Sequence, residues 1–171
     1  MKNILITGAG SFVGTSVQKH LESFPDKYKV TAVGTKNGEW KEMDFSSFDT
    51  VYHVAGLAHS DVGNVSEETK KKYYAVNCDL AVDVAKKAKA EGVKQFIFMS
   101  SAIIYGDSAP IGKEKMITRD TEYSPANFYG DSKVQAEKGL LPLQDDAFKV
   151  VILRCPMIYG KEGKGNFPVL E

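Results

Sequence analysis

Short apolar runs divide the chain, and each has about the length of a β-strand. They occupy residues 3–7, 29–33, 50–54, 95–99 and 148–153. The run at 95–99 is apolar almost throughout, which is typical of a strand buried on both faces. The pattern therefore predicts five strands.

Helical spacing fills the intervals between most of these runs. Apolar residues recur every three or four positions from Val13 to Phe24. A longer stripe follows Ser66, whose two succeeding glutamates suit a helix N-cap, and it ends at Gly92. Its members are Tyr73, Val76, Leu80, Val84 and Ala88. Residues 127–141 predict the last helix.

Two intervals lack helical spacing. Residues 34–49 and 106–124 are mostly polar, and we expect them to be loops. Strands that alternate with helices predict an α/β fold with a parallel, doubly wound sheet of the Rossmann type. At 171 residues the chain has the length of one domain, 1–171. Residues 160–165 are rich in glycine and lysine and no further element follows, which suggests a chain cut short.

Composition and charge narrow the function classes. The apolar fraction of 43% and the charged fraction of 26% are those of an ordinary globular protein. Basic and acidic residues number 22 each, so no net charge favours nucleic acid or an anionic membrane. No apolar run approaches the roughly 20 residues that span a bilayer, and the N-terminus carries no signal-peptide pattern. We therefore expect a cytoplasmic protein with no nucleic-acid partner and no membrane span.

The sequence offers no convincing metal site. Cys78 and Cys155 are far apart in apolar surroundings, so we expect buried thiols rather than a disulfide or metal ligands. His53 and His59 have no third ligand at a useful spacing. We expect His53 to lie in the core of its strand.

A glycine-rich turn follows the first strand and opens the first helix. Its glycines are Gly8, Gly10 and Gly14, which depart from the G-x-G-x-x-G spacing of the dinucleotide fingerprint. The order of strand, glycine turn and helix is that of a loop that binds a phosphate at a helix N-terminus. Taken alone, a plain tight turn is the competing interpretation.

Tyr129 and Lys133 lie four residues apart on a predicted helix, so their side chains share a face. The pKa of free tyrosine is about 10, and a base that works near neutrality needs about 4 kcal/mol of stabilisation of its phenolate. An ammonium about 4 Å away supplies about that much at an effective dielectric constant near 20. Ser101 closes the fourth strand at the edge where open α/β sheets bind ligands. The competing interpretations are that Tyr129 and Lys133 are merely exposed on the surface of a helix, and that Ser101 merely caps the end of its strand.

Several short motifs occur in a fixed order along the chain. They are residues 7–14, Asp44-Phe45, residues 54–58, Asn77, residues 100–106 and residues 129–133. Together they resemble the extended short-chain dehydrogenase/reductase family, in its NAD-dependent epimerase/dehydratase branch, and are similar to the pattern of UDP-galactose 4-epimerases. The resemblance covers essentially the whole chain. It implies a Rossmann domain that lacks the C-terminal substrate-binding region of the family.

The resemblance implies a cofactor site for NAD. Its pyrophosphate-binding residues would be Gly8, Gly10, Ser11, Phe12, Val13 and Gly14. Asp44 would bond the adenine amine, and Phe45 would flank the adenine ring. The residues implied along the path to the ribose and nicotinamide are Ala55, Gly56, Leu57, Asn77, Ser100, Tyr129, Lys133 and Pro156. The implied catalytic residues are Ser101, Tyr129 and Lys133, with no metal.

Some positions depart from the family pattern. Ser11 replaces a glycine, and Lys36 follows the second strand where the family has an acid for the ribose 2′-hydroxyl. Lys36 would favour the 2′-phosphate of NADP, or it is a solvated lysine; both interpretations stay open. Ala102 and Ile103 replace the Asp-Glu pair of the dehydratases and cannot transfer a proton. Met157 replaces an asparagine that touches the substrate phosphate in the epimerases.

The function that the resemblance implies is C4 epimerisation of a nucleotide-sugar or related glycosyl diphosphate in surface-polysaccharide synthesis. The alternatives are an NADPH-dependent keto-sugar reductase similar to dTDP-4-dehydrorhamnose reductase, and a truncated dinucleotide-binding module without catalysis. Family members often form homodimers through the two helices near residues 73–88 and 134–141. The apolar stripe of the first helix fits such a dimer, and packing within the core explains it equally well.

Overall fold

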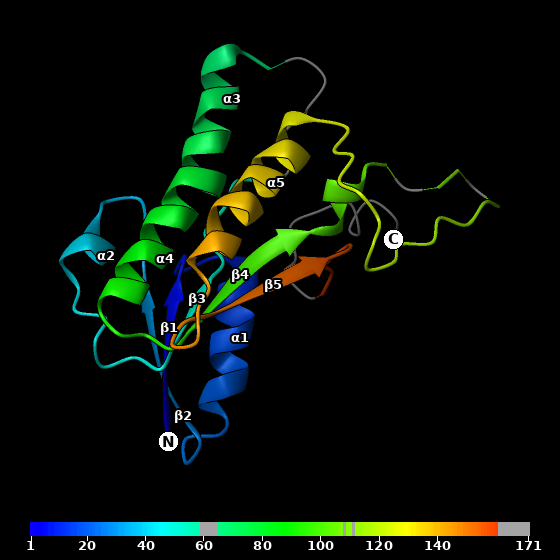
Figure 1. The fold of residues 1–171 in the computed structure, drawn as a ribbon. Helices are drawn as coiled ribbons and strands as arrows, with labels where there is room; N and C mark the ends of the chain where they lie inside the picture. The colour runs from blue at the N-terminus through cyan, green and yellow to red at the C-terminus, as the bar shows by residue number, and fades with distance from the viewer. Residues whose placement is uncertain (59–64, 108, 111, 161–171) are drawn as a thin grey trace.

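One parallel sheet forms the centre of the molecule (Figure 1). The computed structural model describes residues 1–58, 65–107, 109–110 and 112–160. Five strands lie in the order β2-β1-β3-β4-β5. Their bounds are β1 Lys2–Thr7, β2 Tyr28–Val33, β3 Thr50–His53, β4 Gln95–Ser101 and β5 Lys149–Cys155. The predicted parallel α/β sheet is confirmed.

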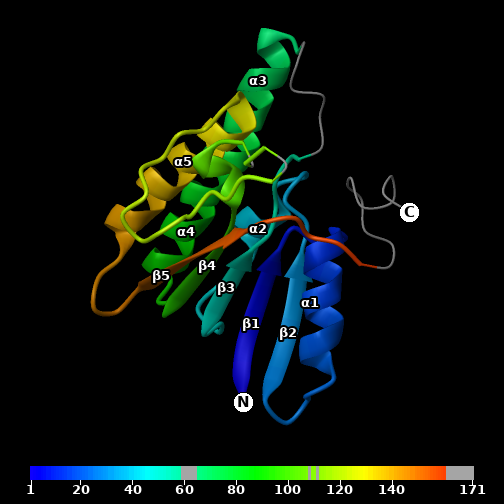
Figure 2. The ribbon, with the colours of Figure 1, turned by 90° about the vertical axis from the view of Figure 1, so that its right-hand side faces the viewer.

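Helices cover both faces of this sheet. The α-helices are α1 Phe12–Glu22, α2 Glu39–Glu42, α3 Glu67–Tyr74, α4 Leu80–Ala90 and α5 Phe128–Leu140. The shorter elements are the π-helical turn η1 Ala75–Asp79 and the 3₁₀ turns η2 Ala102–Tyr105 and η3 Leu141–Leu143. Figure 2 shows three layers, with α1 on one face of the sheet and α3, α4 and α5 on the other.

The strand order creates a switch point between β1 and β3. The chain leaves β1 toward β2 on one side and returns to β3 on the other. In open α/β sheets, ligands bind outside the carboxyl ends of the strands at such a point. Because all the ladders are parallel, the carboxyl ends of β1, β3, β4 and β5 meet at one edge of the sheet.

The main core lies between the sheet and the pair α4 and α5. Phe96 and Phe98 of β4 are fully buried there, while Ile97, which points to the opposite face, is only partly buried. β4 is therefore covered on both faces, as its apolar run predicts, and more completely on the face of α4 and α5. The opposite face holds a smaller cluster around Ile6 and Tyr52, against which α1 packs Val13.

Two other segments differ in detail from the hydrophobic pattern. Residues 34–49 are mostly loop, as expected, but they contain the short helix α2, whose Trp40 is 5% exposed and joins the main core. One buried residue in so short a helix leaves no periodicity to detect. Phe24 is 41% exposed, since α1 ends at Glu22 and its apolar face ends with it.

The long helical stripe is interrupted by the π-helical turn η1. The extra residue of a π-turn changes which side of the helix faces the core. Tyr73 is buried before the turn and Ala81, Val84 and Ala88 after it, while Asn77 is buried within it. A polar residue therefore faces the sheet edge at the middle of this helical segment.

Candidate active site

The glycine turn between β1 and α1 has the geometry of a phosphate-binding loop. Gly8 and Gly10 adopt φ of +108° and +76°, which L side chains rarely do. A Cβ on Gly8 would lie 2.6 Å from the backbone nitrogen of Ala55, whereas one on Gly10 would meet no atom within 4 Å. Gly8 thus lets the turn approach the end of β3, and Gly10 faces open space where a ligand fits.

The first turn of α1 presents backbone amides to this space. Ser11 caps the helix, and its Oγ accepts from the amide of Gly14 at 3.1 Å. The amide of Ser11 bonds the carbonyl of Gly8 at 3.2 Å, so it is not available to a ligand as we had expected. The amides of Phe12 and Val13 are the remaining donors of the first turn, and the helix dipole favours an anion beside them. These residues fit a pyrophosphate.

Asn77 holds the segment that follows β3. Its Oδ1 accepts from the amide of Leu57 at 2.7 Å, and its Nδ2 donates to the carbonyl of Leu57 at 3.1 Å. Nδ2 also bonds Ser132 Oγ on α5 at 3.0 Å. A Cβ on Gly56 would lie 3.2 Å from Asn77 Oδ1 and 3.3 Å from Lys133 Nζ, so this glycine allows close packing. The residues implied on this side of the site therefore lie together.

The three implied catalytic residues meet at the carboxyl edge of the sheet. Ser101 is the last residue of β4, while Tyr129 and Lys133 lie on the first turns of α5. The α5 helix begins there because Asn127 caps it, with Oδ1 accepting from the amide of Gly130 at 2.9 Å. The side chain of Ser101 is near enough to Tyr129 to act on the pKa of its hydroxyl, and Ser101 Oγ accepts from the amide of Ile103 at 3.3 Å. Sequence reasoning predicted this group of three.

The electrostatics of Tyr129 differ from our expectation. Burial raises the pKa of Tyr129 above its ordinary value, and the hydrogen bond from Ser101 acts in the opposite direction. Lys133 does not dominate the pKa of Tyr129 here, because its ammonium donates to the carbonyl of Met99 at 2.9 Å and lies 4.7 Å from the centre of the Phe98 ring. Tyr129 also packs edge-on against the ring of Tyr73 at 6.2 Å.

Lys133 is almost fully buried, with 5% of its surface exposed. Burial lowers its pKa to about 8, although the charge of Glu137 acts to raise it. A lysine with this pKa carries its charge at neutral pH and loses it in mildly alkaline solution. The ammonium is therefore present at this edge of the sheet at neutral pH.

His53 lies in the core of β3, as expected. Its Nδ1 bonds Thr7 Oγ1 at 2.8 Å, and its ring stacks on Phe96 and Phe98. Burial, with a smaller effect of Lys133, lowers the pKa of His53 to about 3, so the ring is neutral. Within the described ranges, His53 Nε2 is the buried side-chain polar atom that has no partner. The other histidine considered, His59, lies outside the described residues.

The adenine end of the site agrees only in part with the resemblance. Asp44 is exposed and its Oδ1 bonds the amide of Ser46 at 2.8 Å, which lowers its pKa. Phe45 is fully buried in the main core beside Phe48, so its ring does not face a ligand as we had expected. The amide of Phe45 is bonded to Glu91 at 2.6 Å.

Three further cofactor assignments fall at the surface or in the core. Lys36 is exposed beyond the end of β2, and Pro156 is exposed directly after β5. Ser100 is 4% exposed and its hydroxyl donates to Glu137, so it does not face the cofactor site as we had expected.

Sequence reasoning missed two acidic residues. A Cβ on Gly34 would lie 3.7 Å from Oε2 of Glu39, so this carboxylate reaches the end of β2, where the family has its acid. It lies five positions after Gly34, outside the expected position. Glu137 lies behind the catalytic residues, fully buried, on the turn of α5 that follows Lys133.

A family model decides the relationship of the chain. The model of the NAD dependent epimerase/dehydratase family matches residues 4–168. The chain belongs to this family. Its match includes the glycine turn, the end of β3 and the group formed by Ser101, Tyr129 and Lys133.

Curated relatives agree with this membership. The chain is 33% identical over 185 residues to a UDP-glucose 4-epimerase of Vibrio cholerae, covering 99% of this chain and 56% of the relative. It is 29% identical over 179 residues to the N-acetyl-alpha-D-glucosaminyl-diphospho-ditrans,octacis-undecaprenol 4-epimerase of Escherichia coli O157:H7, covering 96% of this chain and 51% of the relative. The chain thus spans about half the length of the curated relatives it matches.

A solved structure supports the fold. The UDP-glucuronic acid 4-epimerase from Bacillus cereus in complex with NAD superposes with a TM-score of 0.73 at 21% identity. The match covers 92% of this chain and 57% of that chain. In the part of our chain that the structure describes, no helix is long and apolar enough to cross a membrane. The same residues contain no cluster of three or more His, Cys, Asp or Glu placed to hold a metal ion.

Proposed function

We propose that this chain is the cofactor-binding and catalytic half of an NAD-dependent 4-epimerase that acts on a nucleotide-sugar or a related glycosyl diphosphate. The observation that carries the proposal is that Ser101 at the end of β4 and Tyr129 and the buried Lys133 on α5 lie together at the carboxyl edge of the sheet, with the side chain of Ser101 acting to lower the pKa of Tyr129. This group lies at the same sheet edge as the glycine turn. Family membership and two curated 4-epimerase relatives support the same assignment.

The residues divide the chemistry between them. Bound NAD would accept and return a hydride. Tyr129 takes the proton from the 4-hydroxyl of the sugar and gives it back after the ketone has turned over in the site. Ser101 donates a hydrogen bond to the same oxygen, and the charge of Lys133 favours the phenolate of Tyr129. Each turnover leaves the cofactor unchanged overall.

The chain's own residues also indicate how NAD is held. The amides of Phe12 and Val13 face the pyrophosphate at the N-terminus of α1, and Gly10 gives it room. Asn77 holds Leu57 and thereby shapes the path to the nicotinamide. At the ribose, Glu39 offers an acceptor for the 2′-hydroxyl, which favours NAD over NADP. Lys36 is exposed as Glu39 is, and it is Glu39 whose carboxylate is close to Gly34 at the end of β2.

Other features decide among the alternatives. Ala102 and Ile103 form the 3₁₀ turn η2 and cannot transfer a proton, which argues against a dehydratase. We assign the chain to the cytoplasm, because Cys78 and Cys155 are both free thiols. A role in surface-polysaccharide synthesis is supported by the Escherichia coli relative, which is named as a 4-epimerase of a glycosyl-diphospho-undecaprenol. A homodimer through the face of α4 and α5 is our proposal for assembly.

The test is an assay of UDP-glucose and UDP-galactose interconversion by nuclear magnetic resonance, with NAD present. We expect interconversion without net formation of NADH. Tyr129→Phe should lower turnover at least about 100-fold, since general acid–base catalysis contributes roughly that much. Tyr28→Phe, at the opposite end of the sheet, is the matched control and should leave turnover unchanged.

Three results would contradict the proposal. Normal turnover by Tyr129→Phe would remove its central residue. Net consumption of NADPH would indicate the keto-sugar reductase. Calorimetry that detects NAD binding but no binding of either UDP-sugar would favour the dinucleotide-binding module without catalysis.

A further inference from the structure

Glu137 is a buried carboxylate that the proposed mechanism does not use. Its side chain has no exposed surface, and it lies on α5 one turn after Lys133. A buried charge is costly unless it is paired and hydrogen-bonded. The partners of Glu137 come from β4, from β5 and from the segment that precedes α5.

The first set of contacts joins α5 to β4. Ser100 Oγ donates to Glu137 Oε1 at 2.5 Å, and Lys133 Nζ donates to the carbonyl of Met99 at 2.9 Å. Two neighbouring residues of β4 are thus held by two residues one turn apart on α5. Ser101 is the next residue of β4, and Tyr129 lies one turn earlier on α5. These bonds therefore control the separation of Ser101 and Tyr129.

The second set of contacts joins α5 to β5. Arg154 is the ladder partner of Ser100, so their side chains lie side by side on the sheet. Arg154 Nη2 lies 2.7 Å from Glu137 Oε2, and Nε lies 3.2 Å from each carboxylate oxygen. Glu137 raises the pKa of Arg154, which stays fully charged. One carboxylate therefore binds both members of a ladder pair.

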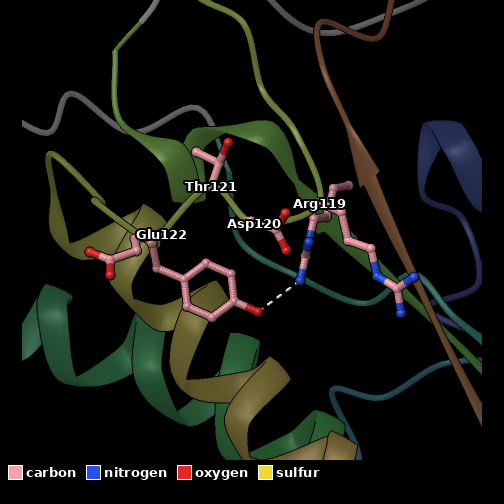
Figure 3. Close-up of a pocket in the computed structure, with 6 residues that line it drawn as sticks. Arg119, Asp120, Thr121 and Glu122 are labelled. Carbon is pink, nitrogen blue, oxygen red and sulfur yellow. Dashed lines mark hydrogen bonds between the residues drawn. The ribbon is translucent and has the colours of Figure 1, made fainter.

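The third set closes the cluster with two tyrosines. Arg154 donates to Tyr105 Oη at 2.6 Å and to Tyr123 Oη at 2.7 Å, and Tyr123 Oη donates to Glu137 Oε2 at 3.0 Å. Tyr105 ends η2, which directly follows Ser101. Figure 3 shows the outer side of this cluster, where Tyr123 and Arg154 help to line a pocket of about 320 Å³. The other lining residues are Arg119, Asp120, Thr121 and Glu122.

We propose that Glu137 is the positioning residue of the active site, and that its bonds to Ser100, Arg154 and Tyr123 fix Ser101 against Tyr129 and Lys133. The proposal rests on the proposed function, in which Ser101, Tyr129 and Lys133 are the catalytic residues. Glu137 also has a second role. Its charge lies one turn from Lys133 and raises the pKa of Lys133, which favours the charged ammonium form. A merely structural residue would not control the protonation of Lys133.

Glu137 and Lys133 face polar and charged groups on the elements that pack against them. Ser100 of β4, Arg154 of β5, and Tyr123 face Glu137. Lys133 interacts through charge with Glu137 on its own helix and with His53 of β3, which is neutral because its pKa is about 3. Burial has the larger effect on the pKa of Lys133 and lowers it, and Glu137 is the charged group among these that acts to raise it.

The test uses Glu137→Gln, which keeps the shape and removes the charge. The titration of Lys133 is followed by the carbon-13 signal of its Cε in the whole chain, assigned with Lys133→Arg. The midpoint should fall below the value near 8 by about one pH unit. Asp145→Asn is the control, since Asp145 pairs with Lys89 at 2.7 Å at the opposite end of α4. It should leave the midpoint unchanged.

A folded Glu137→Gln protein with an unchanged Lys133 midpoint would overturn the proposal. If that variant does not fold, Ser100→Ala removes the link to β4 without a change of charge. It should lower epimerase turnover about tenfold with little change in KM, and normal turnover would equally overturn the proposal. The Lys133 titration requires no catalysis, so a shifted midpoint in an inactive chain would contradict the proposed function alone.

Discussion

Glu39 and Lys36 lie within the same short segment after β2 and have opposite charges. Both side chains are exposed, and the Glu39 carboxylate reaches toward Gly34. A carboxylate there accepts a bond from the ribose 2′-hydroxyl of NAD and repels the 2′-phosphate of NADP. The proposed preference for NAD therefore depends on Glu39, which the expected spacing after β2 did not identify.

Glu39→Gln should reduce the preference for NAD over NADP by about tenfold or more, because a hydrogen bond to a charged group contributes about 1.5–3 kcal/mol. Titration calorimetry with both dinucleotides measures this ratio. Lys36→Gln is the control and should change the ratio little. If Lys36→Gln selectively weakened NADP and Glu39→Gln had no effect, Lys36 would be the residue that selects the cofactor.

Single residues were predictable where their chemistry depends on local spacing. Tyr129 and Lys133 share a face because they are four apart on one helix, and Ser101 was found because it ends an apolar strand. Glu137 and Arg154 were not found, because their partners are distant in sequence and meet only when β4, β5 and α5 pack together. Phe45 was misassigned, since sequence alone did not show that its ring belongs to the core.

At the scale of elements, the glycine turn between β1 and α1 allows a controlled test. Gly10 and Gly92 both adopt positive φ, +76° and +84°, and a Cβ on either meets no atom within 4 Å. Alanine should therefore cost each position a similar amount of stability, about 1 kcal/mol. Only Gly10→Ala places a methyl group beside the amides of α1.

Gly10→Ala should weaken NAD binding at least about tenfold, while Gly92→Ala should bind NAD as the wild type does. Calorimetry gives the affinities, and urea unfolding checks that the two variants are equally stable. Equal affinity for NAD in both variants would show that the pyrophosphate does not lie against this turn.

The elements themselves were mostly predictable from hydrophobic spacing, with failures that have physical reasons. The five strands were located because each is a short apolar run between turns. The two faces of β4 differ in burial, fully buried toward α4 and α5 and partly buried toward the cluster around Ile6, which an apolar run alone does not reveal. The π-turn η1 was missed because it shifts the period inside an otherwise regular helix, and it brings Asn77 to the site.

At the scale of the molecule, His53 couples folding to pH. Burial lowers its pKa to about 3 in the folded chain, while an unfolded histidine titrates near about 6.5. Between these values the unfolded chain binds one more proton, so the free energy of unfolding falls as the pH falls. The contribution of His53 is complete above about pH 6.5 and is lost below it.

The slope from this one group should be about 1.4 kcal/mol per pH unit between about pH 4.5 and 6. His53→Phe keeps a ring between Phe96 and Phe98 and should reduce the slope by that amount in urea unfolding. His20→Gln, at an exposed position on α1, is the control. An identical slope for wild type and His53→Phe would show that His53 is not held neutral.

The part of the family's length that this chain spans determines which experiment is most direct. The chain spans about half the length of its curated relatives, so the sugar that it acts on is part of the proposal. The candidate cofactor site is built from β1, α1, β3 and α5, which the structure describes. Binding of NAD therefore tests the account without reference to the substrate.

The decisive measurement is a calorimetric titration of NAD into the folded wild-type chain. The account predicts saturable binding of one NAD per chain, stronger than the binding of NADP, with affinity lost in Gly10→Ala. A chain that is folded by circular dichroism and takes up no NAD would contradict the account at its centre.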